Sequence, residues 1–569
     1  MAVFGELPLH VGDLRGWNRY SRFLRAVLLW ISTLCFAVFV FMWLRRGQIV
    51  SRYAVNPDEA ELMASAKRGA LSWIPYKDYS TPTFGPVWPT ILGFLNRLGL
   101  PMTIPMAHLL SAITAAMTCS IIAIFLFKRL GLLTTLLIVA PITIQWGLGF
   151  YSADFVGMAT EIFSVFFLIA SVAVGWSRLR TTPAVLLSSV LMSLAFWSKY
   201  QFGLIVLTLL IALWIRHRIN HPLRAVFLVA AGFLCFPIVL FTASAILGTP
   251  FWKLFESIEF TIDYALAGGL NNSGTGTPLD RMASVGGVFF SMISITAVLG
   301  YVLIISLRSQ AVKPEIVRTR LVFQPYFRQI TRYLCGSFPI FIAGIITLYV
   351  SYPLYPHYAY ILLSASVICL MIVSADQVTT CMNQNTVNPH IWNKRILFRL
   401  SLGFALLFSL TNAQAIVVRP WSADKVTWEE ARTSEGAMWK RATNQYGVDL
   451  ETVCPRKSQV LVWGWASELF SYYDWLPASR YPNTAHLMSN NPFGLDTTKF
   501  RSRFIKDLKE SEIDCVINAI GPGFFAAFPP ESDIQVQMPE IVDGTYGLFT
   551  KLIFYWDGGH IFDVYQRVE

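Results

Sequence analysis

The sequence predicts a polytopic α-helical membrane protein with an α/β domain at its C-terminus. Hydrophobic residues make up 54% of the 569 residues and charged residues only 14%, which is too apolar for a soluble globular chain. The apolar residues gather in runs of about 20 residues, the length that crosses about 30 Å of hydrocarbon as a helix. After Arg419 the composition becomes polar, and short apolar runs replace the long ones.

The first apolar run, residues 26–44, predicts a membrane helix rather than a cleaved secretory signal. Arginines precede it at positions 15, 19, 22 and 25. No small-residue cleavage site follows, and the run is long enough to span the hydrocarbon layer. Since basic residues hold the flank of a span in the cytoplasm, we expect residue 1 on that side.

Further apolar runs bring the predicted number of crossings to about eleven, of which two are short. The runs cover residues 26–44, 105–127, 131–147, 158–175, 184–199, 201–215, 223–247, 284–306, 334–351, 358–374 and 398–417. An odd number of spans places the two ends of the chain on opposite sides of the membrane.

Clusters of Lys and Arg between the runs predict the orientation. One choice of parity puts every cluster in the cytoplasm, as the positive-inside rule requires. The clusters are Lys128-Arg129, Arg178 and Arg180, Arg216, Arg218 and Arg224, the connection from Arg308 to Arg332, and Lys394, Arg395 and Arg399. This pattern also explains the net charge of +11 without nucleic acid as a partner.

The same parity places the remaining loops on the opposite face, which we expect to be the periplasmic side of a bacterial inner membrane. These segments are 45–104, 148–157, 248–283, 352–357 and everything after Val418. We therefore predict a membrane domain over residues 1–419, with an outer catalytic loop at 45–104, and an extracytoplasmic domain over residues 420–569.

The C-terminal region has the pattern of a small α/β domain. The apolar runs "QVLVWGW" and "DCVINAI" predict strands, and "TTKFRSRFIKDLKESE" predicts a helix with Phe500, Phe504 and Leu508 on one face. Cys454 and Cys515 both lie here, and an exported location would permit a disulfide between them. No CxxC pair occurs, so the sequence indicates no cysteine-based metal site.

The stretch "AVNPDEAELMASAKRGALSWIPYKDYSTPTFGPVWP" carries the densest early cluster of acids. Asp58 and Glu59 follow the end of a span, and "EAELMASAKRGA" predicts a short interfacial helix. Acids near a helix N-terminus stabilise it by about 0.3–1 kcal/mol. Helix capping is therefore one interpretation of Asp58 and Glu59, and a catalytic role is the other.

Several motifs together resemble glycosyltransferase family 39 and its relatives in the GT-C class. Beside the acidic loop they are "YSADFVGMATEIFSVFFLIAS" with Asp154 and Glu161, "FWSKYQFGLIVL" with Lys199, "YPLYPHYAYILL" with His357, and "VLVWGWASELFSYYDWLPASRYP". Protein mannosyltransferases and the aminoarabinose transferases of lipid A are relatives. The latter place a lysine where this chain has "STPT", which argues against assuming their substrate.

The resemblance implies inverting transfer of a sugar from a polyprenyl-phosphate carrier to an acceptor hydroxyl. Such a hydroxyl needs a carboxylate to accept its proton, and Asp58 is the candidate base. Glu59 is expected to support the site. Asp154 matches the second acidic position of the family and is expected to orient the partners of Asp58 or the acceptor, with loop capping as its alternative.

Lys199 and His357 are the candidates for binding the donor phosphate. A lysine between two apolar runs is costly and is a functional hypothesis by default, although it can also snorkel to the interface. His357 lies at the outer end of a span among aromatic rings, where a structural role is as plausible as a binding role. Tyr358 beside it is expected to contact substrate.

Four further residues are candidates for substrate binding. Lys77 and Asp78 belong to the "PYKDY" match, and Trp465 lies in an aromatic motif with Trp463, Tyr472 and Tyr473. That motif is either a platform for sugar rings or a buried strand and helix. Arg480 is expected to bind an anionic group or to pair with an acid.

The expected substrates are a polyprenyl-phosphate sugar and a glycan, lipid or protein acceptor, with an envelope glycan or glycolipid preferred. No essential metal or other cofactor is expected, although Asp58 and Asp154 could share a divalent cation. Protein O-mannosyl transfer is the alternative reaction. A transporter or flippase for a lipid-linked precursor, or a scaffold without activity, are the alternatives of another class.

Overall fold

The computed structural model describes most of the predicted membrane domain and most of the C-terminal domain. The described residues are 11–46, 49, 57–72, 77–80, 84–130, 132–148, 157–177, 181–217, 222–249, 253–266, 338–350, 358–383, 443–444, 446–489, 497–521, 528–542, 549–556 and 559–567. The predicted spans 284–306 and 398–417 and the predicted domain boundary at 419 lie outside them.

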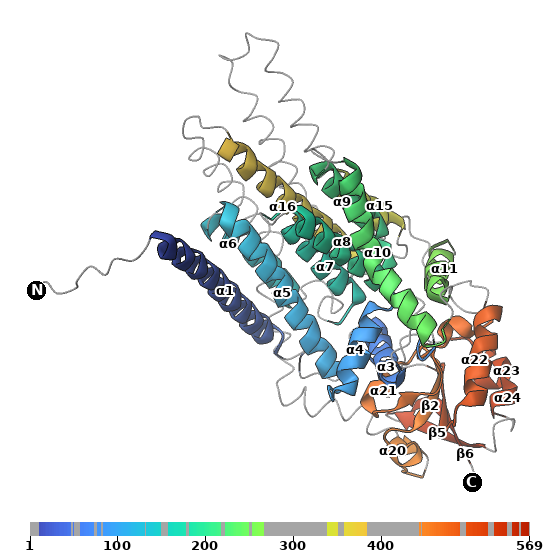
Figure 1. Ribbon diagram of the computed structural model, residues 1–569. Helices are drawn as coiled ribbons and strands as arrows, with labels where there is room; N and C mark the ends of the chain where they lie inside the picture. The colour runs from blue at the N-terminus through green and yellow to red at the C-terminus, as the bar shows by residue number, and fades with distance from the viewer. Residues whose placement is uncertain are drawn as a thin grey trace, which may run out of the picture.

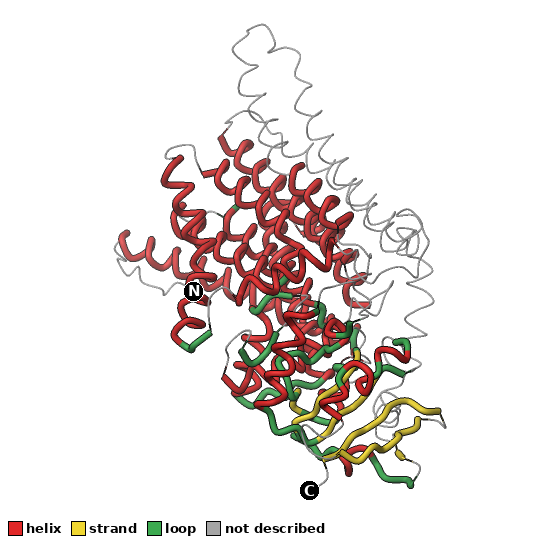
Figure 2. Tube along the Cα trace, turned by 90° about the vertical axis from the view of Figure 1, so that its right-hand side faces the viewer, coloured by secondary structure: helices red, strands yellow, loops and turns green. Residues whose placement is uncertain are grey.

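A bundle of apolar helices forms the larger part of the molecule (Figures 1 and 2). Its helices are α1 (Val11–Leu44), α5 (Ile104–Leu130), α6 (Leu132–Leu148), α7 (Thr160–Gly175), α8 (Thr181–Ser198), α9 (Gly203–His217), α10 (Pro222–Ile246), α15 (Phe338–Val350) and α16 (Ala359–Asn383). Each lies on one of the predicted apolar runs. Five helices of the described residues are long and apolar enough to cross a membrane.

Three shorter helices lie in the segments predicted to face the outside. They are α3 (Pro57–Ser72), α4 (Val87–Arg97) and α11 (Lys253–Leu266). The sequence predicts α3 but not α4 or α11, which are too short to stand out by apolar length. α3 and α4 pack against each other between the bundle and the C-terminal domain (Figure 1).

The C-terminal domain is built on a mixed six-stranded sheet with the order β1-β5-β6-β4-β2-β3. The strands are β1 (Thr443–Asn444), β2 (Gln459–Gly464), β3 (Leu476–Pro477), β4 (Cys515–Ala519), β5 (Phe549–Trp556) and β6 (Gly559–Arg567). β2 runs parallel to both β3 and β4, whereas β6 is antiparallel to β4 and β5. The two strands and the helix predicted from the sequence are β2, β4 and α22 (Thr498–Glu510).

Both faces of this sheet are covered, so β2 is apolar on both sides. Leu461 and Trp463 face α22, where Phe504 is buried. Val460 and Val462 face the opposite layer. Short helices complete the two layers: α20 (Leu450–Val453), α21 (Glu468–Tyr472), α23 (Ile534–Gln537), α24 (Pro539–Val542), and the 3-10 turns at Ala485–Leu487 and Pro530–Ser532.

The layer that covers Val460 and Val462 also contains Ala64 of α3. A helix of the membrane domain therefore completes part of the core of the C-terminal domain. A disulfide joins Cys454 to Cys515 with their Cα atoms 6.1 Å apart, which decides the pairing that the sequence left open. Disulfides persist in oxidising compartments, so this bond agrees with an exported domain.

Candidate active site at one end of the helix bundle

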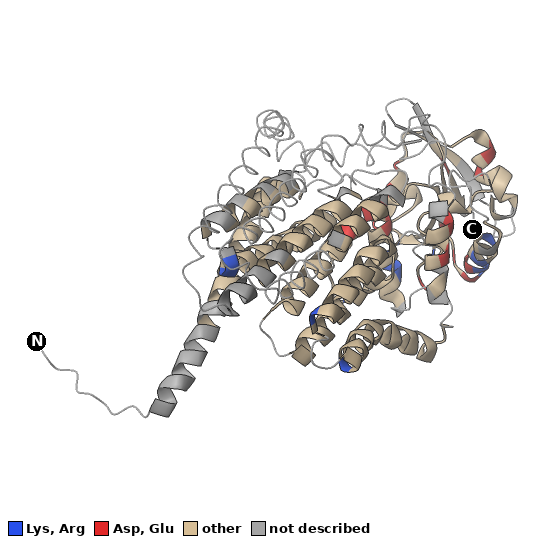
Figure 3. Ribbon diagram, turned by 90° about the horizontal axis from the view of Figure 1, so that it is seen from above, with Lys and Arg blue, Asp and Glu red and all other residues tan. Residues whose placement is uncertain are grey.

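The site lies where α3 meets the ends of several bundle helices. Glu161 is in the first turn of α7, Lys199 directly follows α8, and Tyr358 directly precedes α16. These helix ends correspond to the face predicted to be outside, whereas Lys128 and Arg129 lie in the last turn of α5 at its other end. The acidic residues drawn in red lie toward the end of the bundle that meets the C-terminal domain (Figure 3).

Asp58 is in the first turn of α3, which begins at Pro57. Proline fits the first helical position because its missing N–H would have no helical partner there, and an acid in this turn is favoured by the helix dipole. Asp58 keeps 17% of its side chain exposed, whereas Glu59 and Glu61 are buried. Asp58 is therefore the most exposed of these three acids.

Lys199 lies between α8 and the 3-10 turn Tyr200–Phe202, with extended backbone and a side chain only 2% exposed. Its Nζ is 3.0 Å from Oε1 of Glu161 and 3.8 Å from Oδ2 of Asp58. A buried cation needs such partners because isolated burial of a charge is costly. Glu161 supplies the close contact, and Asp58 the looser one.

Tyr358 completes this group from the start of α16. Its buried hydroxyl is hydrogen-bonded to the Gln201 side chain and interacts electrostatically with Lys199, Glu161 and Asp58. The structure therefore brings together two predicted residues from distant segments, Asp58 and Lys199, and adds Tyr358, for which the sequence predicted substrate contact.

Glu59 is turned away from Lys199, toward α5. Its Oε1 is 3.2 Å from Nε2 of His108, and its Oε2 accepts a hydrogen bond of 2.9 Å from the backbone N–H of Met158. Both of its carboxylate oxygens are thus occupied inside the protein. This geometry suits the supporting role expected for Glu59, because it fastens the first turn of α3 to α5 and to the segment before α7.

A close backbone contact fixes the segment between α3 and α4 against the end of α8. The N–H of Gly85 donates to the carbonyl of Ser198 at 3.1 Å. A Cβ atom at position 85 would lie 1.8 Å from the carbonyl oxygen of Trp197, which no side chain can accept. Only glycine allows this approach, and it holds the residues that lead into Lys199.

The remaining residues of the "PYKDY" match contribute through the backbone or are exposed. Asp78 is buried, and its carbonyl oxygen accepts a hydrogen bond of 3.0 Å from Nε of Arg68. Lys77 is exposed. The next tyrosine, Tyr79, is buried, and its hydroxyl lies 2.6 Å from that of Thr90 in α4.

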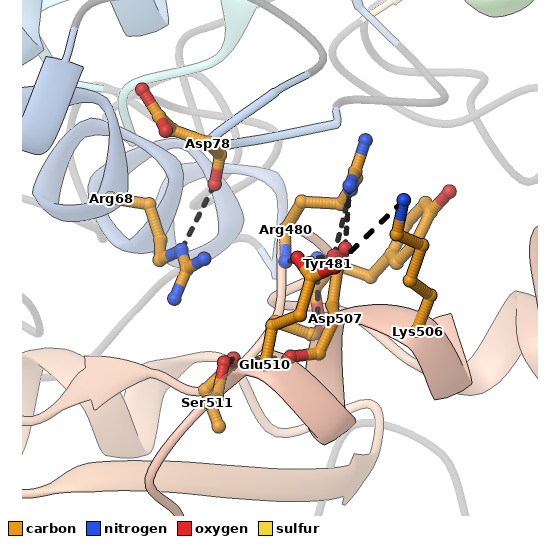
Figure 4. A network of polar contacts seen from close by, with 10 residues as sticks. Arg68, Asp78, Arg480, Tyr481, Lys506, Asp507, Glu510 and Ser511 are labelled. Atoms are coloured by element: carbon orange, nitrogen blue, oxygen red, sulfur yellow. Dashed lines mark hydrogen bonds and ion pairs between the residues drawn. The ribbon is translucent and has the colours of Figure 1, made fainter. Parts of the chain in front are cut away.

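A set of polar contacts, which we call the seam, joins α3 and the following loop to the C-terminal domain. Nζ of Lys67 donates to the carbonyl of Phe470 and to Asp474, at 2.8 Å each. Arg68 also donates to the carbonyl of Pro477 at 2.8 Å. Figure 4 shows Arg68 with Asp78 on one side of the seam and the Arg480 network on the other.

Arg480 belongs to the seam rather than to an exposed anion site. Its Nε donates to Oδ2 of Asp507 at 2.7 Å, and its backbone N–H donates to the same oxygen at 3.1 Å (Figure 4). Its carbonyl accepts from the N–H of Ser80. The sequence left two interpretations for Arg480, binding an anionic group and pairing with an acid. The structure shows the pairing, with Asp507.

The aromatic motif of the C-terminal domain is mainly part of its core. Trp463 is buried and its Nε1 donates to the carbonyl of Ser532 at 2.8 Å. Tyr473 is buried and stacks on Trp475, with ring centroids 4.4 Å apart. Trp465 and Tyr472 are partly exposed. A sugar platform would therefore rest on Trp465 and Tyr472, because the other two rings face inward.

Two predicted site residues, Asp154 and His357, lie outside the described residues. Among the described residues, no group of three His, Cys, Asp or Glu side chains is placed to hold a metal ion. Asp154 is not among the described residues, so the absence of an essential metal stays a prediction.

Three buried residues of this region had no assigned role at the sequence level: Glu161, Glu61 and His108. Each is a titratable residue in a helix, and Glu161 and His108 interrupt apolar runs. Ionisable groups are rare in such runs and mark functional positions. That signal was available for Glu161 and His108, but their partners are distant in sequence and only the fold reveals them.

No known family profile and no curated protein matches the sequence. The chain is similar to the structure of ArnT from Cupriavidus metallidurans bound to undecaprenyl phosphate, with 13% identity, 95% of this chain and 97% of that chain covered, and a TM-score of 0.48. It is also similar to the apo oligosaccharyltransferase of Archaeoglobus fulgidus, with 12% identity, coverage of 86% and 69%, and a TM-score of 0.43. At these TM-scores the overlap assigns no substrate, and the residues of the site have to carry that argument.

Proposed function

We propose that the chain is an integral membrane glycosyltransferase that transfers a sugar from a polyprenyl-phosphate-linked donor to an acceptor hydroxyl, with inversion. The observation that carries the proposal is the unequal pairing of Lys199. Glu161 binds it at 3.0 Å, so Asp58 at 3.8 Å stays close to a positive charge and yet remains partly exposed.

Asp58 is placed to act as the base. A carboxylate within reach of the acceptor hydroxyl can accept its proton, and the side chain of Asp58 is partly exposed. As the acceptor oxygen bonds to the anomeric carbon, its proton passes to Asp58. The bond between that carbon and the phosphate oxygen breaks at the same centre, and the phosphate leaves with the electron pair.

Lys199 is placed to stabilise the departing lipid phosphate. The phosphate gains negative charge as the bond breaks, and a fixed cation stabilises that charge without reorganising. Tyr358 adds a hydroxyl beside the lysine. Glu161 holds Lys199 in position when no phosphate is bound, and Glu59 with His108 holds the helix turn that carries Asp58.

The place of the site favours a lipid-linked donor. It lies at one end of a helix bundle that exposes large apolar side chains on its surface, such as Phe36 and Phe39 of α1 and Phe227 of α10. A polyprenyl tail matches that surface, whereas the sequence has no Gly-rich phosphate loop for a nucleotide sugar. We propose that the reaction takes place on the periplasmic side of a bacterial inner membrane.

An envelope glycan or glycolipid remains the proposed acceptor, with a protein hydroxyl as the alternative. Trp465 and Tyr472, partly exposed in the C-terminal domain, support a carbohydrate acceptor. Mass spectrometry of the envelope from a strain that lacks this protein tests the choice. Loss of one sugar from glycans or lipids is the expected result, and loss from glycoproteins alone would overturn it.

The central experiment is transfer by the purified protein in lipid nanodiscs, supplied with polyprenyl-phosphate sugars and envelope fractions. We expect incorporation of the sugar, and none from a nucleotide sugar without a lipid carrier. Incorporation from the nucleotide sugar alone would contradict the proposal.

A further inference from the structure

Glu61 is a buried carboxyl group beside the base that the mechanism above does not use. It lies on α3, in the same helix as Asp58, and is 1% exposed. Its Oε2 accepts a hydrogen bond of 3.2 Å from Nδ2 of Asn483, whereas its Oε1 has no hydrogen-bond partner among the described residues. Buried polar atoms are rarely left unpaired, so this oxygen is a candidate to form a hydrogen bond with a ligand.

Asn483 comes from the C-terminal domain and is held in one orientation. It is 6% exposed, and its Oδ1 accepts a hydrogen bond of 3.1 Å from the N–H of Ala485. That bond directs Nδ2 toward Glu61. The carboxyl and the amide, which belong to different domains, thus form one polar group next to Asp58.

The protonation of Glu61 determines what this group can bind. Burial raises the pKa of Glu61 to about 8, and the charge of Asp58 adds to this, while the Asn483 hydrogen bond and Lys199 act in the opposite direction. At neutral pH the carboxyl group is therefore mostly protonated. Its O–H can donate one hydrogen bond, and its remaining lone pairs and the Asn483 amide complete a neutral site.

We propose that Glu61 and Asn483 form a subsite that binds a hydroxyl group of a neutral sugar beside Asp58. A hydroxyl both donates and accepts a hydrogen bond, which matches a protonated carboxyl group paired with an amide. An anionic group would be repelled by the charge of the neighbouring Asp58, which also raises the pKa of Glu61. The inference rests on the proposed glycosyl transfer, and it makes the C-terminal domain part of sugar recognition.

The hydroxyl has two possible sources, the transferred sugar and the accepting glycan. They are distinguished by measuring the KM for the polyprenyl-phosphate sugar and for the acceptor separately. A rise in donor KM in the variants assigns the subsite to the transferred sugar, and a rise in acceptor KM assigns it to the acceptor.

The test uses Glu61→Leu, Glu61→Gln and Asn483→Leu in the nanodisc assay. Loss of a hydrogen bond to a substrate hydroxyl at a buried site is expected to lower kcat/KM about 10- to 100-fold for Glu61→Leu and Asn483→Leu. Glu61→Gln keeps the shape and a donor, so we expect activity within about threefold of wild type at pH 7. The wild type should lose affinity as the pH rises through about 8, and Glu61→Gln should not.

Deoxy sugars make the test independent of folding. The deoxy analogue that lacks the bound hydroxyl should be used equally well by wild type and Glu61→Leu, whereas the parent sugar should separate them. If the parent and every deoxy analogue are affected alike, Glu61 has only a structural role and the inference fails.

Glu468 provides the matched control. Like Glu61 it is buried, and burial raises its pKa to about 8, but it lies on α21 rather than on the helix that carries Asp58. Glu468→Gln should leave the donor and acceptor KM and their pH dependence unchanged. An equal effect of Glu468→Gln would overturn the inference. An inactive Asp58→Asn together with unaffected Glu61 variants would reject this subsite alone, whereas an active Asp58→Asn would reject the proposed function.

Discussion

The Lys199 cluster, which consists of Lys199, Glu161, Asp58 and Tyr358, and the seam contain the same kinds of residue and differ in how closely their charged groups approach one another. In the seam, Lys67 donates to a carboxylate and a backbone carbonyl at 2.8 Å each, and Arg480 makes both side-chain and backbone contacts with Asp507. In the Lys199 cluster, one carboxylate lies 3.0 Å from Nζ of Lys199, whereas the other lies 3.8 Å away, beyond hydrogen-bond distance.

This difference separates a structural role from a chemical one. Charged groups whose partners are all supplied by the protein stabilise one arrangement, and they have little capacity left for a substrate. Asp58 lies 3.8 Å from Nζ of Lys199, and its side chain is partly exposed. The Lys199 cluster and the seam should therefore respond differently when one member of a charged pair is removed.

Asp58→Asn should give the largest effect. Asparagine keeps the shape of the side chain but accepts no proton, so transfer should fall by about 10²- to 10⁴-fold, while expression and lipid-donor binding stay unchanged. Glu59→Gln should be milder, because Glu59 faces His108 and Met158. Wild-type rates for Asp58→Asn in the nanodisc assay would remove the distinction between the two regions.

Lys199→Met should reduce both activity and stability. It leaves the fully buried Glu161 without its cation, and removal of one partner from a buried ion pair costs about 3–5 kcal/mol. Thermal unfolding in detergent and binding of a polyprenyl phosphate measure the two effects. A variant that is less stable but binds the lipid phosphate with wild-type affinity would show that Lys199 is merely structural.

Lys67→Met is the matched change in the seam and should affect only stability. It removes hydrogen bonds to Phe470 and Asp474, which contribute about 1–3 kcal/mol when a charged donor is involved. Protease sensitivity of the C-terminal domain should increase, while transfer at low temperature keeps its kcat. A loss of kcat as large as that of Asp58→Asn would place the seam in the chemistry.

Lys506→Ala should have the smallest effect. Lys506 and Glu510 form an exposed pair on α22, at 3.8 Å, within the network drawn in Figure 4. Exposed pairs contribute about 0–1 kcal/mol, so neither the unfolding temperature nor the transfer rate should change measurably. A clear loss of activity would show that this face of α22 contacts a substrate.

The sequence predicted most of the described fold because its signals are local. The length of the long apolar runs predicts the bundle helices, and short apolar runs predict β2 and β4, which are buried along almost their whole length. α4 and α11 were missed since a short helix in an outer loop has no length signal. The order of the strands was also unpredictable, because the pairing of β6 with β4 depends on segments far apart in sequence.

The site was predicted in parts rather than as an arrangement. Asp58 and Lys199 were each identified from their own surroundings, but nothing local shows that they face each other. Glu161 and Glu61 were passed over, as their importance lies in partners on other elements. Trp463 and Tyr473 illustrate the converse, because aromatic rings look alike in sequence whether they line a binding surface or fill a core.

The contact between Lys67 and Asp474 joins residues 407 positions apart, and this has a consequence for biosynthesis. The helix α3, which carries Asp58, is synthesised early, but the C-terminal domain that packs against α3 is synthesised last. On the proposed orientation, that domain must also cross the membrane and oxidise Cys454 and Cys515 before it docks. Nascent or truncated chains would therefore contain Asp58 but lack the C-terminal domain that packs against α3. Sugar transfer would begin only once translation and export are complete.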